Sequence, residues 1–416
     1  MFPKMVKIKQ SVPAPELENV ADEIRKQITL LQLNPTVFKG KKIGITAGSR
    51  GITNIPLILK TLISIVRDGG GLPHIVAAMG SHGGATAEGQ GEMLASLGIT
   101  EESMGAPILC NEEVIQVGKT KDDIPVYVNS EAAKLDGLII CNRVKGHTDF
   151  SGEIESGLCK MMTIGLGNHK GASTAHFYAV NYGYTEMIQE SARVIMENTP
   201  VLFGLGIVEN WKNGTMVIRG TLPDALIETE KELLEIYKET TLKLPFKSAD
   251  ILIVGELGKN ISGAGMDTKV IGRIKIIGQK EPDYPKITNI AVLGLTEASH
   301  GNATGIGLAD YTTESVYRQI DLKATTINGL TSMSPDQIKL PVILDTDKEA
   351  IEWAYRTLGP AKEGHVSIAY ILNTMSLEEL VVSENMLDTL KGEIEIIGEA
   401  KEFAFTEDDT LISPLL

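Results

Sequence analysis

Three glycine-rich loops carry charged or titratable side chains suited to acid–base chemistry on a small anion. Arg50 lies in the segment TAGSRG, His82 in GSHGGA and His147 in RVKGHTDFSG. Imidazole has an ordinary pKa of ~6.5 and exchanges protons near neutral pH. A guanidinium stays charged and binds a carboxylate through two parallel hydrogen bonds. The neighbouring glycines allow the backbone to approach a ligand closely, whereas the alternative is three unrelated surface turns.

A fourth segment, ESGLCKMMTIGLGNHKGASTAH, contains an amine suited to covalent chemistry. Lys160 is flanked by leucine, cysteine and two methionines, and partial burial would lower its pKa and free the amine as a nucleophile. Gly165, Gly167 and Gly171 predict a turn whose backbone N–H groups could cradle a phosphate. The spacing GxGxxxG is neither the dinucleotide-binding nor the P-loop fingerprint, so this turn alone is weak evidence.

Histidines are concentrated beside these loops. Four of the seven lie there, namely His82, His147, His169 and His176. Neutral imidazole also ligates metals, although a structural role is the simpler interpretation for His169. No HExxH or HxH element is present in the sequence, so a conventional preformed zinc site is poorly supported.

Short apolar runs alternate with helical segments along the chain. The expected strands are Lys42–Thr46, His74–Met79, Gly137–Val144, Val201–Val208, Asp250–Leu257, Thr288–Thr296, Pro341–Asp345 and Val366–Leu372. The expected helices are Pro56–Arg67, Ala87–Leu97, Glu186–Glu197, Ala225–Thr240, Glu314–Thr325 and Lys348–Leu358. Continuous apolar strands alternating with helices predict an α/β fold with mainly parallel sheets flanked by helices. The carboxyl ends of parallel strands meet at one edge, so Arg50, His82 and His147 should converge there.

The length of 416 residues favours two domains. A charged helix ending at Thr240, then Pro245 and a new apolar strand, predicts an N-terminal cofactor-binding and catalytic domain at 1–246 and a C-terminal α/β domain at 247–416. The second domain should close over the substrate, with the active site in the interdomain cleft, and its strand-end loop GELGKNISGAGMDTK carries Lys269. The acidic stretch Glu378–Asp409 is expected to be a solvated last element, the alternative being a return to the first domain.

Composition excludes several classes of partner. A net charge of −15 argues against nucleic acid, which needs clustered Lys and Arg, but permits a small anionic substrate in a locally positive pocket. Three cysteines without a CxxC pair do not make a disulfide scaffold. The first residues lack the apolar core of a secretory signal, and the apolar stretch Ile55–Val66 is too short for a membrane span. We therefore expect a cytoplasmic protein that is reduced and not membrane-bound.

The quoted motifs together resemble the nickel-pincer-nucleotide lactate racemase family, with its related 2-hydroxy acid racemases and epimerases. The likeness includes the Arg loop and the SHGG loop and is strongest from Asn142 to His176. It implies an isomerase acting on a small anionic 2-hydroxy acid, with a cofactor supplied by maturation proteins. It also implies that Lys160 is covalently linked to the nickel-pincer nucleotide, pyridinium-3,5-bisthiocarboxylic acid mononucleotide nickel, and that His176 ligates the nickel.

The resemblance assigns the remaining roles as well. The acid–base pair falls on His82 and His147, and the residue that binds the substrate carboxylate falls on Arg50. The residues expected to contact the cofactor are Lys160, Gly165, Gly167, Ser49 and Lys269, of which Lys269 is a looser match to a family lysine that contacts substrate. Lactate racemases carry Asp three residues before this Arg, where the present chain has Ala47. The interval from His147 to Lys160 is also longer, so a substrate other than lactate is expected.

These residues suit inversion of C2 by reversible hydride transfer, because removal of the C2 proton would leave a poorly stabilised carbanion. One histidine on each face would take the hydroxyl proton as hydride leaves C2. Two alternatives remain open: a zinc-type hydrolase using His82, His147 and His176, and a non-catalytic nucleotide- or sugar-acid-binding protein. A nicotinamide dehydrogenase is disfavoured because the GxGxxG fingerprint is absent from the sequence. The oligomeric state and the particular 2-hydroxy acid stay open.

Overall fold

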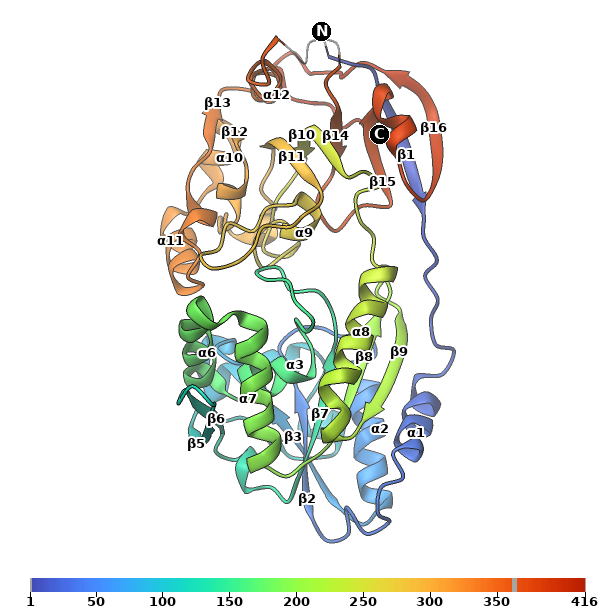
Figure 1. Ribbon diagram of the computed structural model, residues 1–416, viewed down its shortest axis with the longest axis vertical. Coiled ribbons are helices and arrows are strands. Elements are labelled where there is room, and N and C mark those ends of the chain that lie inside the picture. Colours follow the sequence, from blue (N-terminus) through green and yellow to red (C-terminus); the bar gives the residue numbers. More distant parts are fainter. Residues whose placement is uncertain (1, 361–364, 416) are drawn as a thin grey trace. The chain divides into compact units, whose positions relative to one another are not determined.

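The computed structural model describes residues 2–360 and 365–415, and the chain divides into two compact units (Figure 1). The N-terminal unit comprises Ala14–His147 and Ser151–Thr241. The C-terminal unit comprises Met1–Pro13, Thr148–Phe150 and Leu242–Leu416. Each unit is built on a sheet of its own with helices packed against it, as the α/β prediction requires.

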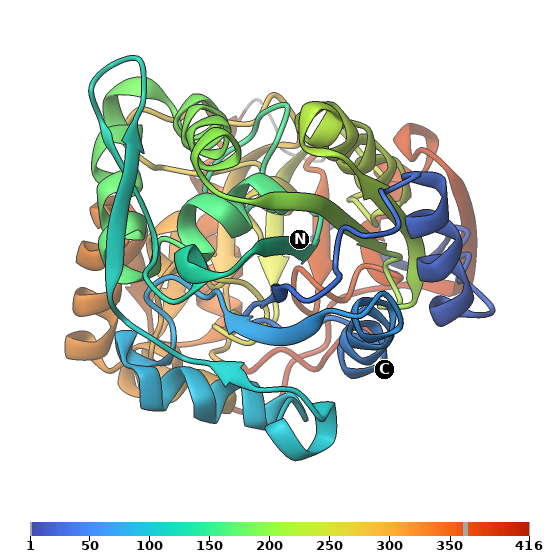
Figure 2. The same ribbon diagram turned by 90° about the horizontal axis from the view of Figure 1, so that it is seen from below.

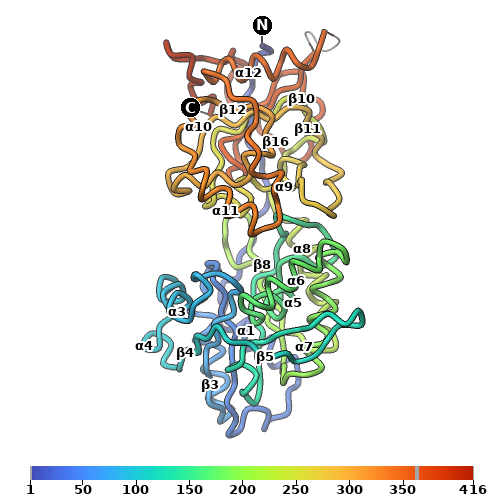
Figure 3. Tube along the Cα trace, turned by 90° about the vertical axis from the view of Figure 1, so that its left-hand side faces the viewer, coloured from blue at the N-terminus to red at the C-terminus, as the bar shows by residue number. Residues whose placement is uncertain are grey.

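The N-terminal unit has a six-stranded sheet in the order β4-β3-β2-β7-β8-β9. Its strands are β2 (Lys42–Ala47), β3 (Leu72–Ala77), β4 (Ile108–Leu109), β7 (Gly137–Arg143), β8 (Val201–Glu209) and β9 (Thr215–Thr221). Its helices are α1 (Val20–Leu30), α2 (Ile55–Asp68), α3 (Ala87–Ser96), α4 (Glu101–Met104), α5 (Leu158–Lys160), α6 (Asn168–Tyr182), α7 (Tyr184–Asn198) and α8 (Leu226–Thr240). Only β9 runs antiparallel to its neighbour, and a separate hairpin of β5 (Val114–Lys119) and β6 (Pro125–Asn129) packs beside α6 and α7 (Figure 3).

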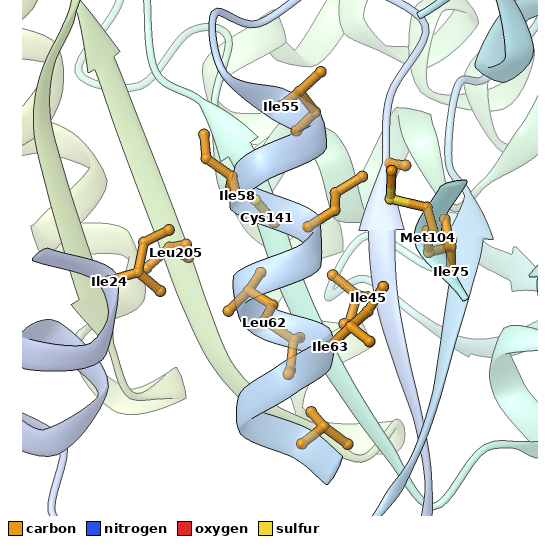
Figure 4. Packing of buried hydrophobic residues seen from close by; sticks show 14 of the residues in the cluster. Ile24, Ile45, Ile55, Ile58, Leu62, Ile63, Ile75, Met104, Cys141 and Leu205 are labelled. Carbon is orange, nitrogen blue, oxygen red and sulfur yellow. The ribbon is translucent and has the colours of Figure 1, made fainter. Parts of the chain in front are cut away.

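Both faces of this sheet are covered, which explains the continuous apolar strands. Alternate residues such as Ile43 and Ile45 point to the face that carries α1 and α2. Helix α2 packs against this face with apolar residues at helical spacing, among them Ile55, Ile58 and Leu62 (Figure 4). Helices α7 and α8 (green to yellow-green) lie on the other face, opposite α2 in blue (Figure 2). The two covered faces confirm the predicted fold class.

The strand order places a topological switch beside β2. From β2 the chain moves outward to β3 and β4, and it then returns to add β7 and β8 on the opposite side of β2. The loops that follow β2 and β7 therefore leave the same sheet edge in opposite directions. In open parallel sheets such a divergence at the carboxyl edge is the usual place for a ligand.

The C-terminal unit has an eight-stranded sheet in the order β13-β12-β11-β10-β14-β15-β1-β16. Its strands are β1 (Met5–Ser11), β10 (Ser248–Val254), β11 (Lys286–Val292), β12 (Tyr311–Thr313), β13 (Val342–Leu344), β14 (Ile368–Ile371), β15 (Glu379–Ser383) and β16 (Glu393–Lys401). Its helices are α9 (Thr268–Ile271), α10 (Glu314–Gln319), α11 (Leu322–Thr331) and α12 (Asp347–Arg356). The strands from β13 to β14 are parallel, and β15, β1 and β16 continue the sheet antiparallel.

Two details differ from the sequence expectations. Strand β1 was not predicted, and it pairs with β15 and β16 in the C-terminal unit, which also contains the acidic stretch Glu378–Asp409. The expected helix Glu314–Thr325 is interrupted, because Ile320 is extended and the Asp321 side chain caps a new helix by accepting the Ala324 N–H. The expected division after residue 246 and the interdomain cleft stay predictions.

Candidate functional site

The loops after β2 and β3 pack against the segment that carries Lys160. A Cβ atom placed on Gly48 would lie 3.2 Å from Cε of Met161, and one on Gly80 would lie 3.2 Å from Cγ2 of Ile164. The Gly80 N–H also donates to the Gly165 carbonyl at 3.2 Å. Glycine at these two loop positions permits a backbone approach that larger residues would obstruct, and the approach brings three of the predicted segments together.

Ser49 and His82 join the first two loops directly. Ser49 Oγ lies 2.5 Å from His82 Nδ1. Ser49 lies just after the end of β2, at Ala47. His82 is exposed and lies just before the turn that leads into α3. Ser49 was expected to contact the cofactor. The structure gives it a histidine partner, whose ring orientation the hydroxyl can fix.

The loop that carries His147 is tied back to the segment before α5. Lys145 and Ser156 form an antiparallel bridge, and the His147 N–H donates to Glu155 Oε2 at 2.6 Å. The Glu155 side chain is fully buried, and Lys238 Nζ lies 3.9 Å from its other oxygen. His147 itself is half-buried, and its loop is fixed by a buried carboxylate.

Lys160 ends the short helix α5 and is directly followed by a π-helical turn, Met161–Gly165. Its side chain is half-buried, whereas Cys159 and Met161 on either side are buried. Single π-helical turns recur at functional sites because they redirect side chains within a helix. The apolar flank predicted from sequence is therefore present, and the amine lies at the edge of the core.

His176 lies on α6, close enough to Lys160 for the charge of the amine to affect it. Burial, and secondarily the positive charge of Lys160, lower the pKa of His176 to about 4. The Tyr184 ring contacts the imidazole edge to face, with ring centroids 5.7 Å apart. The imidazole is therefore neutral at neutral pH, which is the form that binds metals.

Gly165 and Gly167 lie where the π-helical turn meets α6. Gly165 belongs to the π-helical turn, Gly167 precedes α6, and both are buried. A Cβ on Gly165 would lie 2.8 Å from the Ala78 carbonyl oxygen, and one on Gly167 would lie 2.3 Å from that of Thr163. Glycine at these positions permits close packing of the helical backbone. Their contact with a cofactor stays a prediction.

The loop with Arg50 is anchored at its far end. The Thr53 N–H donates to Glu209 Oε1 at 2.6 Å, while the second oxygen of Glu209 pairs with Arg143. Arg143 therefore has a structural role at the edge of the sheet. Arg50 is exposed and has no ion-pair partner in residues 2–360 and 365–415, so its guanidinium is available to an anion.

Lys269 lies in the C-terminal unit, on the four-residue helix α9. Its N–H donates to Asp267 Oδ1 at 2.9 Å, and the neighbouring hydroxyl of Thr268 donates to the Thr148 carbonyl. The contacts described above connect four of the predicted segments, whereas Lys269 lies in the C-terminal unit.

Sequence reasoning missed the buried carboxylates that hold this site. Glu155 fixes the His147 loop, and Glu230 on α8 accepts the Cys159 N–H at 2.7 Å. Glu230 shares the inward stripe of α8 with Leu226, Leu233 and Leu234, all of which are buried. The sequence does contain a signal for Glu230: it is a glutamate within an otherwise apolar helical stripe, where an apolar residue is normally found.

The described residues contain no group of three or more His, Cys, Asp or Glu side chains arranged to hold a metal ion. The predicted zinc set of His82, His147 and His176 thus lacks geometric support. Across the same ranges, no helix combines the length and the apolar character needed to cross a bilayer.

Comparison with known proteins agrees with this architecture. Residues 6–186 match the family described as lactate racemase N-terminal domain. A crystal structure of a Thermotoga maritima protein from a structural genomics programme has 13% identity and a TM-score of 0.53, over 88% of this chain and 99% of that chain. The lactate racemase apoprotein from Thermoanaerobacterium thermosaccharolyticum has 12% identity and a TM-score of 0.50, over 90% of this chain and 99% of that chain. No curated protein matches the sequence.

At these identities the two solved structures support the fold alone, and the likeness to a family is limited to the N-terminal match. That match covers the Arg loop, the SHGG loop and the whole block from Asn142 to His176. Residues 6–186 of the chain are therefore similar to the lactate racemase N-terminal domain, as these motifs predicted.

Proposed function

We propose that the protein is a racemase or epimerase that inverts C2 of a small 2-hydroxy acid, with a nickel-pincer nucleotide linked to Lys160. The supporting observation is that the charge of Lys160 on α5 acts on the neutral His176 on α6, and that the loop bearing His82 packs against the turn between these helices. An amine and an imidazole in this arrangement suit one covalent bond and one metal–nitrogen bond. A substrate other than lactate fits the Ala47 departure noted above.

The residues present fit the cofactor. The half-buried amine of Lys160 would carry the covalent bond, and a ring nitrogen of His176 would bind the nickel. When bound, the cofactor supplies an electrophilic acceptor for the hydride of C2. The glycines at positions 48 and 80 keep the two neighbouring loops close to this segment without side chains that would compete for the space.

The remaining roles fall on residues of the sheet edge. Arg50 would bind the substrate carboxylate and fix C2 relative to the two histidines. His82, oriented by Ser49, and His147, on a loop held by Glu155, would each remove or return the hydroxyl proton from one face of the planar 2-keto acid. Return of the hydride to the opposite face completes inversion with no net change in atoms or electrons.

The proposal is tested by loading the full chain with cofactor in the presence of maturation proteins and offering it a panel of 2-hydroxy acids. Chiral chromatography then follows the configuration at C2, with the Lys160→Arg chain as the matched control. We expect at least one acid to be inverted by the loaded wild type and none by the control. Binding of acids without inversion, or equal turnover by a zinc-loaded chain without nucleotide, would overturn the proposal.

A further inference from the structure

Glu230 is a buried carboxyl that lies directly beneath the helix bearing Lys160. Its side chain is 0% exposed, and its Oε2 accepts the Cys159 N–H at 2.7 Å. The Leu158 N–H and the Cys159 thiol also interact with this carboxyl. Within the described residues, Oε1 of Glu230 is buried without a hydrogen-bond partner. A carboxyl in this position is costly to bury, which calls for a specific reason for its presence.

The carboxyl supplies the cap that α5 lacks. Gly157 precedes the helix and has no side chain with which to bond the first N–H groups. A Cβ at Gly157 would lie 2.3 Å from Glu230 Oε1, so the carboxyl occupies the space of the missing side chain. Glu230, which lies far along the chain on α8, therefore caps α5 in place of a local N-cap side chain.

Two further contacts hold the same helix. The Asn142 side-chain amide, at the end of β7, donates to the Gly157 carbonyl at 2.8 Å. Leu158 is fully buried against β8, where a Cβ on Gly204 would lie 2.8 Å from its Cδ1. With Glu230 on the third side, the backbone of α5 is fixed to two strands and one helix. Lys160 is the last residue of that helix, so these contacts also set the direction in which its side chain leaves the core.

We infer that Glu230 is a positioning residue that fixes the turn carrying Lys160 and thereby presents the amine for attachment of the cofactor. The part concerning attachment rests on the proposed function, whereas the restraint on the Lys160 turn does not. Burial raises the pKa of Glu230 to about 7 even though three donors favour its ionised form. A neutral apolar residue would avoid this cost of burial, but it would leave the Leu158 and Cys159 N–H groups without an acceptor.

The restraint is tested first in the cofactor-free full chain. Glu230→Ala removes the acceptor, Glu230→Gln retains an amide oxygen in its place, and Glu239→Gln makes the same change at an exposed site on α8. Hydrogen exchange of the Leu158 and Cys159 amides should accelerate about tenfold or more in the alanine variant and stay close to wild type in both glutamine variants. Unchanged exchange in the alanine variant would overturn the inference.

The consequence for Lys160 is measured by competitive acetylation of the same four proteins with acetic anhydride, using peptide mass spectrometry. Exposed Lys170 on α6 serves as the internal reference. In the alanine variant the rate at Lys160 should rise toward that at Lys170, and glutamine at position 230 should restore the wild-type rate. A purely structural role would accelerate amide exchange while leaving the Lys160 rate unchanged, and that result would also overturn the inference.

Cofactor attachment provides the last readout. After loading in the presence of maturation proteins, the mass increase at Lys160 should be largely lost in the alanine variant and retained in the glutamine variants. Full loading of the alanine variant would contradict a positioning role in attachment. If wild type itself gains no mass, the proposed function fails, while amide exchange and acetylation still decide whether Glu230 restrains Lys160.

Discussion

Ser49 Oγ lies 2.5 Å from His82 Nδ1, and this bond connects the loop after β2 to the loop after β3. The hydroxyl both donates and accepts, so it can bond the ring in either neutral tautomer and while the ring carries a proton. The other ring nitrogen, Nε2, is then the atom that can exchange a proton with a ligand. Ser49 is thus a neutral partner for a histidine proposed to act as both acid and base.

Replacing Ser49 with alanine should lower turnover without loss of the cofactor. Loss of an orienting partner of this kind typically costs about 10- to 100-fold in activity. The measurement is kcat for inversion by the loaded enzyme, together with the intact mass. Ser81→Ala, an exposed serine of the same loop as His82, is the matched control and should behave as wild type. Equal kcat for the Ser49 and Ser81 variants would show that the bond has no role in turnover.

Replacing His82 or His147 with alanine should abolish inversion in both directions while the Lys160 adduct is retained. Removing a positioned acid–base group typically costs about 10²- to 10⁴-fold in rate. Each variant is assayed with both enantiomers and weighed by intact mass spectrometry. His169→Ala, at an exposed position of α6, is the control. Loss of the adduct from either variant would instead assign that histidine to cofactor attachment.

Arg50→Lys should weaken substrate binding more than it slows the chemical step. Lysine keeps the charge but loses the two parallel hydrogen bonds to a carboxylate, so kcat/KM should fall about tenfold or more, mainly through a higher KM. Steady-state kinetics separate the two constants. Arg25→Lys, about half exposed on α1, controls for the same change elsewhere on the surface. An unchanged KM would remove Arg50 from the substrate site.

Glu230→Gln should change how stability depends on pH. The pKa of Glu230 is raised by burial from 4.5 to about 7, so the folded state holds a proton that the unfolded state releases. The favourable contribution of protonated Glu230 is therefore fully present below pH 4.5 and is lost as the pH rises through 7. At ~1.4 kcal/mol per pKa unit, wild type should lose roughly 3 kcal/mol relative to the glutamine variant over this interval.

That comparison is made by urea unfolding of both proteins at a series of pH values from 4.5 to about 8, with Glu239→Gln as the exposed control. The difference in unfolding free energy between wild type and the Glu230 variant should change across the interval, whereas the control should run parallel to wild type. Parallel curves for all three proteins would show that Glu230 does not titrate in this range.

The predictable part of the structure came from patterns that are local in sequence. Buried parallel strands appear in a sequence as continuous apolar runs. The ends of β2, β7 and β8 accordingly lie within one or two residues of their predicted bounds. The loops with Arg50, His82 and His147 were predicted because glycine beside a polar residue is visible over a few positions, and the rule for parallel sheets predicts that these loops meet at one edge.

Long-range pairings were not predictable in the same way. Strand β1 lies at the start of the chain but pairs with β15 and β16, more than 360 residues away, and no local pattern identifies that partner. Glu230 caps α5 across 71 residues, so its role depends on the packing of α8. The close packing around Gly165 was not predicted, because glycine that permits close helix packing has the same local spacing as glycine in a phosphate-binding loop.

The most direct test of the central proposal is inversion of a 2-hydroxy acid by the loaded protein in D2O, with C2 of the product examined by NMR and mass spectrometry. Hydride that leaves C2 and returns without exchange retains the original hydrogen, so the account predicts inverted product without deuterium at C2. The converse substrate, deuterated at C2, should keep its label in H2O. Deuterium uptake at C2 that keeps pace with inversion would show proton abstraction instead and would contradict the account.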